Sequence, residues 1–191
     1  MIVFVRHGET TPNRQGLLLG RADPALTDRG RRQADELAEW IGAWEPVAVL
    51  ASPLARARET AAPIAAAVGC DVEIDDRLIE IDYGEWEARP FAELPPDVVA
   101  RWRDDADFAP PGGESLRVVG KRVAAFCEER LDQRVTVAVS HVSPIKAAVT
   151  WGLGVGDELA WRMRLDVASV TRIGPGPALL SFNESRGSLH P

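Results

Sequence analysis

The chain has 191 residues, of which 46% are hydrophobic and 27% are charged, and this composition suits one domain with a substantial apolar core. Its formal net charge of −7 and its sequence pI near 5.0 argue against a nucleic-acid-binding protein, because such binding depends on clustered Lys and Arg. We therefore expect a single domain over residues 1–184, a tail at residues 185–191, and no nucleic-acid partner.

The first predicted element is a buried strand. Residues 2–5 form a short apolar, β-branched run that ends at Arg6-His7-Gly8. Met1 leads directly into this run without a basic region and a long apolar segment, and no stretch of the chain approaches the length of a membrane span. We expect a cytoplasmic protein without a membrane partner.

Helices and strands then alternate along the chain. Thr27 is a suitable N-cap for a helix over residues 28–44. Residues 47–51 are typical of a second strand, and the apolar helix face that follows ends before Gly69. A short third strand is predicted at residues 72–74.

The middle of the chain is less regular. Residues 81–111 are rich in Trp and Pro, with one helix expected around residues 98–105, and we interpret this segment as a lid or specificity insertion. Ser115 can cap the next helix, and residues 135–139 are the most uniformly apolar strand. Pro144 then fits the first turn of another helix.

The last two strands are predicted to form a hairpin. Residues 168–173 and 179–182 flank the turn sequence Gly174-Pro175-Gly176-Pro177. Together the elements predict an α/β fold, a three-layer α/β/α sandwich whose central sheet is mostly parallel with an antiparallel edge. Ligands of such sheets bind outside the carboxyl ends of the strands.

Reactive side chains follow four of the predicted strands. They are Arg6 and His7 after the first strand, Arg56 after the second, Glu80 after the third and His141 after the fourth. Because the carboxyl ends of parallel strands share one edge of the sheet, we expect these groups to face one crevice.

This set of side chains is suited to phosphoryl transfer. The guanidiniums of Arg6 and Arg56 can bind phosphate oxygens through paired donors and stabilise the charge that builds on them. The same cations disfavour protonation of His7, whose neutral imidazole is a competent nucleophile toward phosphorus. Glu80 can protonate the leaving alkoxide and later deprotonate the attacking water.

Two further groups are predicted to bind the phosphate. His141 and the side-chain amide of Asn13 can each donate to a phosphoryl oxygen. For His141 the alternative is a hydrogen-bonded histidine at a strand end, and for Asn13 it is a purely structural place in a turn.

The residue types leave other assignments open. Arg58 is a second basic choice in the same block as Arg56, which could instead pair with Glu59 across a helix turn. Glu80 lies in an acidic stretch whose ordinary role would be a solvated surface. The competing acids are Asp82, Glu85 and Glu87.

No metal or cofactor is expected, because no pair among the histidines and acids has the short spacing of a helix or hairpin metal site. Cys70 and Cys127 lie far apart in apolar patterns and are predicted to be reduced core thiols. Trp86 and Trp102 are predicted to belong to the core rather than to a substrate mouth.

The motif Arg6-His7-Gly8-Glu9-Thr10 resembles the hallmark of the histidine phosphatase superfamily, whose fold is phosphoglycerate mutase-like. The resemblance extends over residues 1–150, and it implies a three-layer fold, a phosphohistidine on His7, no metal, and Glu80 as proton donor. It also favours Arg56 over Arg58, with Arg6 and His141 as the other phosphate ligands. The later motifs are Ser52-Pro53-Leu54-Ala55-Arg56-Ala57-Arg58-Glu59-Thr60-Ala61, Gly84-Glu85-Trp86-Glu87, Pro111-Gly112-Gly113-Glu114-Ser115 and Ser140-His141.

Two departures from the family pattern concern the pocket. The aromatic residue common before Asn13 is Pro12 here, and the usual Gly-Gly after the second histidine is Val142-Ser143, followed by Pro144-Ile145-Lys146. These changes predict a different pocket wall near the phosphate.

The resemblance is to the phosphatase branch rather than to mutases. Cofactor-dependent mutases carry Arg-His after the acidic residue, whereas Ile81-Asp82 follow Glu80 here, so the mutase site for a glycerate carboxylate is absent. The compact size and residues 78–87 resemble broad-specificity acid phosphatases and α-ribazole-phosphate phosphatases.

We therefore expect a monomer or homodimer that hydrolyses a small organic phosphate monoester. The alternatives are a phosphomutase and a regulatory domain that only binds a phosphorylated ligand. The physiological substrate is not encoded in any motif of residues 81–111.

Overall fold

β1 occupies an inner position in a six-stranded sheet with the order β3-β2-β4-β1-β5-β6. The computed structural model describes residues 1–132 and 134–185. The first four strands of the chain pair in parallel, whereas β5 and β6 add an antiparallel edge, as predicted. The strands are β1 (Ile2–Arg6), β2 (Ala48–Ala51), β3 (Val72–Ile74), β4 (Thr136–Ser140), β5 (Val170–Gly174) and β6 (Ala178–Glu184).

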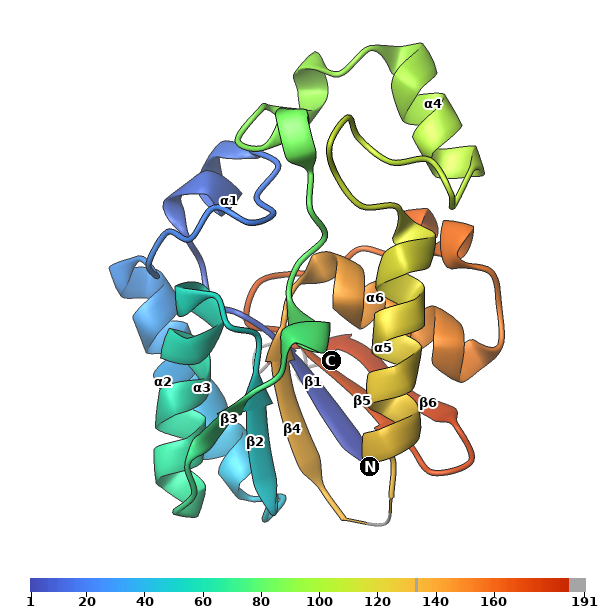
Figure 1. The fold of residues 1–191 in the computed structure, drawn as a ribbon. Helices are drawn as coiled ribbons and strands as arrows, with labels where there is room; N and C mark the ends of the chain where they lie inside the picture. The colour runs from blue at the N-terminus through green and yellow to red at the C-terminus, as the bar shows by residue number, and fades with distance from the viewer. Residues whose placement is uncertain (133, 186–191) are drawn as a thin grey trace, which may run out of the picture.

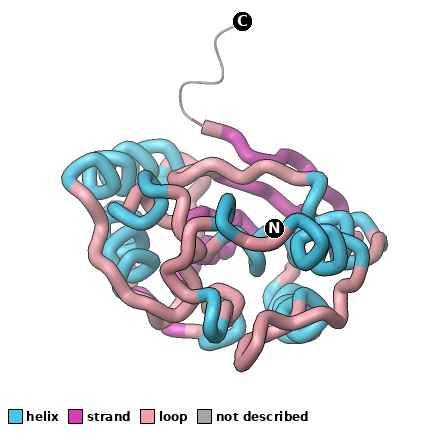
Figure 2. Tube along the Cα trace, turned by 90° about the horizontal axis from the view of Figure 1, so that it is seen from above, coloured by secondary structure: helices cyan, strands magenta, loops and turns pink. Residues whose placement is uncertain are grey.

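Helices cover both faces of the sheet. α2 and α3 lie on one face and α5 and α6 on the other (Figure 1), and a view from above shows helices on both sides of the strands (Figure 2). The α-helices are α1 (Thr11–Gln15), α2 (Asp28–Gly42), α3 (Ala55–Val68), α4 (Pro96–Asp104), α5 (Leu116–Arg130) and α6 (Val142–Leu153). Four 3-10 helices are η1 (Asp76–Leu78), η2 (Gly84–Trp86), η3 (Phe91–Glu93) and η4 (Asp157–Arg162) among the described residues.

The alternation of side chains along β1 explains the three layers. Ile2 and Phe4 pack into the core formed with α5 and α6, whereas Val3 and Val5 pack into the core formed with α2 and α3. All four side chains are fully buried. Successive residues of a strand point to opposite faces, so a continuous apolar run requires cover on both sides. The three-layer prediction is confirmed.

The predicted caps are present in the structure. The Thr27 side chain accepts a hydrogen bond from the Gly30 N–H at the start of α2, and Ser115 accepts one from the Val118 N–H at the start of α5. Pro144 is the third residue of α6, in its first turn.

Some elements differ from their predicted bounds. α1 was not predicted, because a helix of five residues is too short to show apolar periodicity and depends on a local cap at Thr10. α2 ends at Gly42 rather than at residue 44, and β6 continues to Glu184. The predicted tail at residues 185–191 lies outside the described residues except for Ser185.

Residues 81–111 lie at the end of the molecule where β1 and β4 finish (Figure 1) and contain η2, η3 and α4. Trp86 and Trp102 are buried in a separate cluster with Leu18 and Leu94. Both tryptophans are buried in a small aromatic core of their own, as predicted, but Trp102 also lines a cavity.

The two cysteines are free thiols, Cys127 buried and Cys70 half-buried, so the prediction of a core thiol holds fully for Cys127. In residues 1–132 and 134–185, no helix is long and apolar enough to cross a membrane.

Candidate active site

The register of β1 and β4 brings two histidines together. Arg6 pairs with Ser140 across the two parallel strands, so the next residues, His7 and His141, leave the sheet side by side. Their ring centroids are 5.0 Å apart, and both side chains are buried.

His7 is held with one ring nitrogen engaged and the other free to react. Its Nδ1 lies 2.7 Å from the carbonyl oxygen of Gly8. Because a carbonyl can only accept, Nδ1 carries the proton and the lone pair is on Nε2. Burial lowers the pKa of His7 well below its ordinary value, Arg6 and Arg56 lower it further, and the Gly8 hydrogen bond opposes them. These effects favour the neutral imidazole of His7, with its lone pair on Nε2.

The glycine after His7 is required by close packing. A Cβ atom at Gly8 would collide with the backbone carbonyl of Gly30 in α2. On the other side, the Gly8 N–H donates to Thr60 Oγ1 at 3.0 Å, and the Thr60 hydroxyl donates to the Arg56 carbonyl at 2.8 Å. The Arg-His-Gly motif is thus fixed between α2 and α3.

Both arginines are anchored and retain unused donors. Arg56 is fully buried in the first turn of α3 and donates to the carbonyls of Gly20 and Ala22 at 2.8 and 2.7 Å. Arg6 donates to the Leu165 carbonyl at 2.5 Å. In the described part of the chain, the buried Nε atom of each arginine has no hydrogen-bond partner. Rigid guanidiniums with unused donors are suited to an anion.

Glu80 lies at the N-terminus of α6, next to His141. Its carboxylate is 3% exposed and accepts hydrogen bonds from the N–H groups of Ile81, Val142 and Ser143 at 2.8, 3.0 and 3.1 Å. The helix dipole also favours negative charge at this position. The carboxylate is therefore fixed in place by three main-chain N–H groups.

The structure separates the predicted residues from their competitors. Arg58 is exposed, whereas Arg56 is buried. Glu85 is exposed, and Asp82 and Glu87 accept hydrogen bonds from loop N–H groups away from α6. Of these four acids, Glu80 is the buried one.

His141 is oriented by Ser52, to which sequence reasoning assigned no role. Ser52 follows β2, and its Oγ lies 2.7 Å from His141 Nε2. His141 Nδ1 is buried and has no partner among the described residues. Burial, followed by Arg56, lowers the pKa of His141 well below its ordinary value. Ser52 and Thr60 both lie in the recognised sequence block, but only the register and helix packing show their contacts.

Asn13 lies in the capping box of α1. Its side-chain oxygen accepts hydrogen bonds from the N–H and the hydroxyl of Thr10, at 3.2 and 2.8 Å. These contacts fit the alternative that Asn13 has a structural place in a turn. Only its amide nitrogen could reach a phosphate, and that role stays a prediction.

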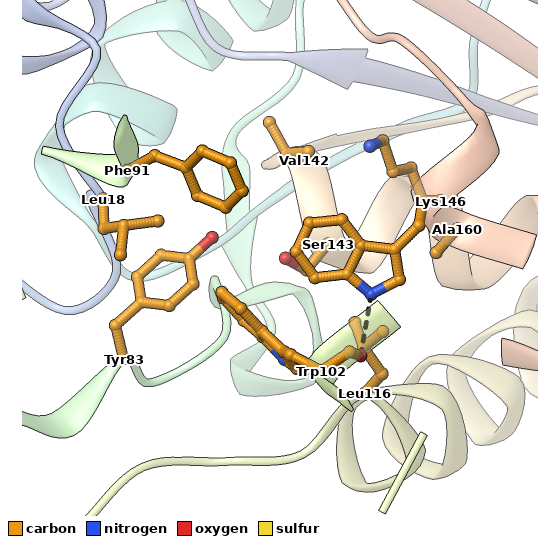
Figure 3. Close-up of a pocket in the computed structure, with 10 residues that line it drawn as sticks. Leu18, Tyr83, Phe91, Trp102, Leu116, Val142, Ser143, Lys146 and Ala160 are labelled. Carbon is orange, nitrogen blue, oxygen red and sulfur yellow. Dashed lines mark hydrogen bonds between the residues drawn. The ribbon is translucent and has the colours of Figure 1, made fainter. Parts of the chain in front are cut away.

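A cavity of about 130 Å³ lies at the start of α6 (Figure 3). Val142 and Ser143, which depart from the family pattern, line it and also donate to Glu80. Lys146, which belongs to the segment predicted to change the pocket wall, lines it too, as does Tyr83, to which the sequence assigned no role. The remaining lining residues are Leu18, Phe91, Trp102, Leu116, Ala160 and Trp161.

No three His, Cys, Asp or Glu side chains are grouped as a metal site requires, in the residues that the structure describes. Arg6, His7, Arg56, Glu80 and His141 are brought together, as the strand order predicts, and their surroundings are those of an anion site.

Comparison with protein families identifies the class. Residues 2–184 match the model of the histidine phosphatase superfamily (branch 1), and the chain belongs to this superfamily.

Some relatives carry phosphatase names, and others are named probable phosphoglycerate mutase GpmB. The chain is 36% identical to phosphoserine phosphatase 1 of Hydrogenobacter thermophilus over 181 residues, which cover 90% of this chain and 85% of that protein. It superimposes with a TM-score of 0.87 on a structure of mycobacterial glucosyl-3-phosphoglycerate phosphatase Rv2419c with VO3, at 30% identity and covering 96% and 98% of the two chains. These relatives do not support the narrower resemblance to α-ribazole-phosphate phosphatases.

A longer relative is the protein named bifunctional protein Rv2228c of Mycobacterium tuberculosis. It is 36% identical over 177 residues, which cover 89% of this chain and 49% of that protein. The chain therefore spans about half the length of this relative.

Proposed function

We propose that the chain is a phosphatase that hydrolyses a small organic phosphate monoester through a phosphohistidine on His7, without a metal ion. The observation that carries this proposal is the hydrogen bond between His7 Nδ1 and the Gly8 carbonyl. It leaves Nε2 as the free nucleophile, and burial together with Arg6 and Arg56 keeps the ring neutral.

In the first step, the phosphoryl group lies among the unused donors of Arg6 and Arg56. Nε2 of His7 attacks phosphorus in line, and the bond between phosphorus and the ester oxygen breaks. Glu80 gives its proton to the leaving oxygen and becomes a carboxylate, which the N–H groups at the start of α6 stabilise. The arginines stabilise the charge on the other three oxygens.

In the second step, water attacks the phosphohistidine. Glu80 takes a proton from the water, the bond between phosphorus and Nε2 breaks, and inorganic phosphate leaves. His141 assists when its proton is on Nδ1, because Nε2 then accepts from the Ser52 hydroxyl and Nδ1 donates to a phosphoryl oxygen. The amide nitrogen of Asn13 is a further donor.

The nucleophile is tested with His7→Ala. We expect turnover to fall by about 10⁴- to 10⁶-fold, because the covalent route is lost. Brief incubation with a ³²P-labelled aryl phosphate should label the wild-type chain with an acid-labile phosphoryl group and should leave the variant unlabelled. Turnover or labelling that persists in the variant would contradict the assignment, and turnover that is abolished by EDTA would contradict metal independence.

The alternatives differ in their products. A phosphomutase would isomerise a phosphoglycerate after priming by a bisphosphate, whereas a phosphatase releases inorganic phosphate. A regulatory domain would bind phosphorylated ligands and release no phosphate from any monoester.

A further inference from the structure

The cavity at the start of α6 has rigid aromatic walls. Trp102 contacts Tyr83 and Trp161 edge to face, with ring centroids 5.9 and 4.7 Å apart, and Trp161 also packs against Phe91. An apolar cavity of about 150 Å³ is sufficient to hold benzene. The cavity of about 130 Å³ therefore has the size and lining for one small apolar group.

One cation interrupts this apolar lining. Lys146 lies one helical turn after Val142 in α6, so both side chains face the same space. Figure 3 shows the Lys146 ammonium and the hydroxyls of Tyr83 and Ser143 turned toward the space between the labelled residues. Within the described residues, no carboxylate forms an ion pair with Lys146.

Lys146 lies one helical turn after Val142, whose N–H group donates to Glu80. Burial lowers the pKa of this ammonium, Glu80 raises it and Arg6 lowers it further. A half-buried cation without an ion-pair partner is costly, and an anionic ligand would offset that cost. In the proposed function, Arg6, Arg56 and His141 donate to the phosphoryl oxygens. Lys146 is therefore available to bind a second anionic group on the substrate.

We propose that Lys146 binds a carboxylate on the leaving group of the substrate, while the aromatic walls hold the apolar part that joins this carboxylate to the ester oxygen. This inference rests on the proposed function, which it makes more specific. It differs from the mutase arrangement, because the cation comes from α6 and not from residues directly after Glu80. The expected substrates are compact monoesters that carry a carboxylate on an apolar body.

A matched pair of substrates tests this inference. Phenyl phosphate and 4-carboxyphenyl phosphate share the ring and the ester, and differ in the carboxylate. We expect Lys146→Met to lower kcat/KM for 4-carboxyphenyl phosphate by about ten- to a hundred-fold, mainly through KM, and to change phenyl phosphate by less than about two-fold. Each substrate is compared between enzymes, so the different acidities of the two phenols cancel.

Two variants serve as controls. Lys146→Arg keeps the charge and should retain most of the preference for the carboxylate. Lys121, the only other lysine of the chain, is exposed on α5, and Lys121→Met should leave both substrates unchanged. Turnover of phenyl phosphate by Lys146→Met shows that the variant is folded.

Equal losses on both substrates would overturn the inference, because Lys146 would then act on the phosphoryl group or on the fold. No loss on either substrate would overturn it as well. If the wild-type chain hydrolyses no monoester, the proposed function fails separately. In that case, calorimetry can measure the dissociation constants of phenylphosphonate and 4-carboxyphenylphosphonate, which makes the same comparison without turnover. If Lys146→Met changes both dissociation constants equally, the carboxylate site is rejected.

Discussion

Two regions meet at the candidate active site, and they are held together by different interactions. The strand-end region, which carries His7 and His141, is fixed by the β1–β4 register and by main-chain hydrogen bonds. Residues 81–111 are held by short helices, by a few main-chain hydrogen bonds to residues 16–18, and by aromatic packing around Trp102. Backbone geometry sets the positions of the two histidines in the first region, whereas side chains of the second region line the cavity beside α6. Side-chain packing changes with single substitutions, so specificity can vary while the chemistry is kept.

Glu80 lies at the boundary between the two regions, and after His7→Ala, the variant Glu80→Gln should give the next largest effect. Gln cannot supply the proton for the leaving oxygen, so we expect kcat to fall by about 10²- to 10⁴-fold. The loss should be greater for alkyl phosphates than for nitrophenyl phosphate, whose leaving group needs little protonation. Steady-state kinetics on the two ester types measures this difference.

The matched control is Glu85→Gln, an exposed acid in the same stretch, which should keep its activity. Losses of equal size on alkyl and nitrophenyl esters would contradict the proton-donor role of Glu80.

Trp102→Ala should disturb residues 81–111 without disturbing the sheet. Trp102 is 2% exposed and contacts Tyr83, Trp86 and Trp161, so truncation of such a side chain typically costs about 3–5 kcal/mol of local stability. Hydrogen exchange should become faster in α4 and η2 and remain slow in β1 and β4, and KM should rise more than kcat falls.

Phe4→Ala is the comparison for the sheet, because Phe4 is fully buried against Phe126 in the larger core. It should lower the free energy of global unfolding. If Trp102→Ala also accelerates exchange in β1, the two regions unfold as one unit and the contrast between them is wrong.

The smallest expected effect is on the pH dependence of stability. The pKa values of His7 and His141 in the folded chain lie below their ordinary value of 6.5, so the unfolded chain binds these protons first as the pH falls. Their contribution to the free energy of unfolding is therefore complete above pH 6.5 and is lost as the pH falls from 6.5 toward the folded pKa values. The slope from each histidine should be about 0.7 kcal/mol per pH unit at pH 6.5 and should approach about 1.4 kcal/mol per pH unit below it.

Urea unfolding of the wild-type chain and of His141→Asn between pH 6.5 and 5.5 measures this slope. The variant should lose less stability over this pH unit by about 1 kcal/mol, because an unfolded histidine is only half protonated at pH 6.5. Identical slopes would show that His141 is protonated in the folded chain at these pH values.

Local sequence patterns determined much of the fold. The apolar run of β1 requires cover on both faces, and the caps at Thr27 and Ser115 depend on neighbours in the chain, so each could be predicted. The order of reactive residues after successive strands also indicated one crevice at the carboxyl ends. The motif around His7 indicated the family from sequence alone. Its glycine is required because Gly8 packs against Gly30 with no room for a side chain.

Tertiary structure decided the contacts between distant segments. The Ser52–His141 hydrogen bond depends on the β2–β4 register, and the choice of Glu80 among four acids depends on which carboxyl the start of α6 faces. The cavity around Lys146 is lined by ten residues that are spread along the chain from Leu18 to Trp161, and their side chains meet only after folding. No local pattern encodes such contacts, because their free energy depends on the positions of several elements at once.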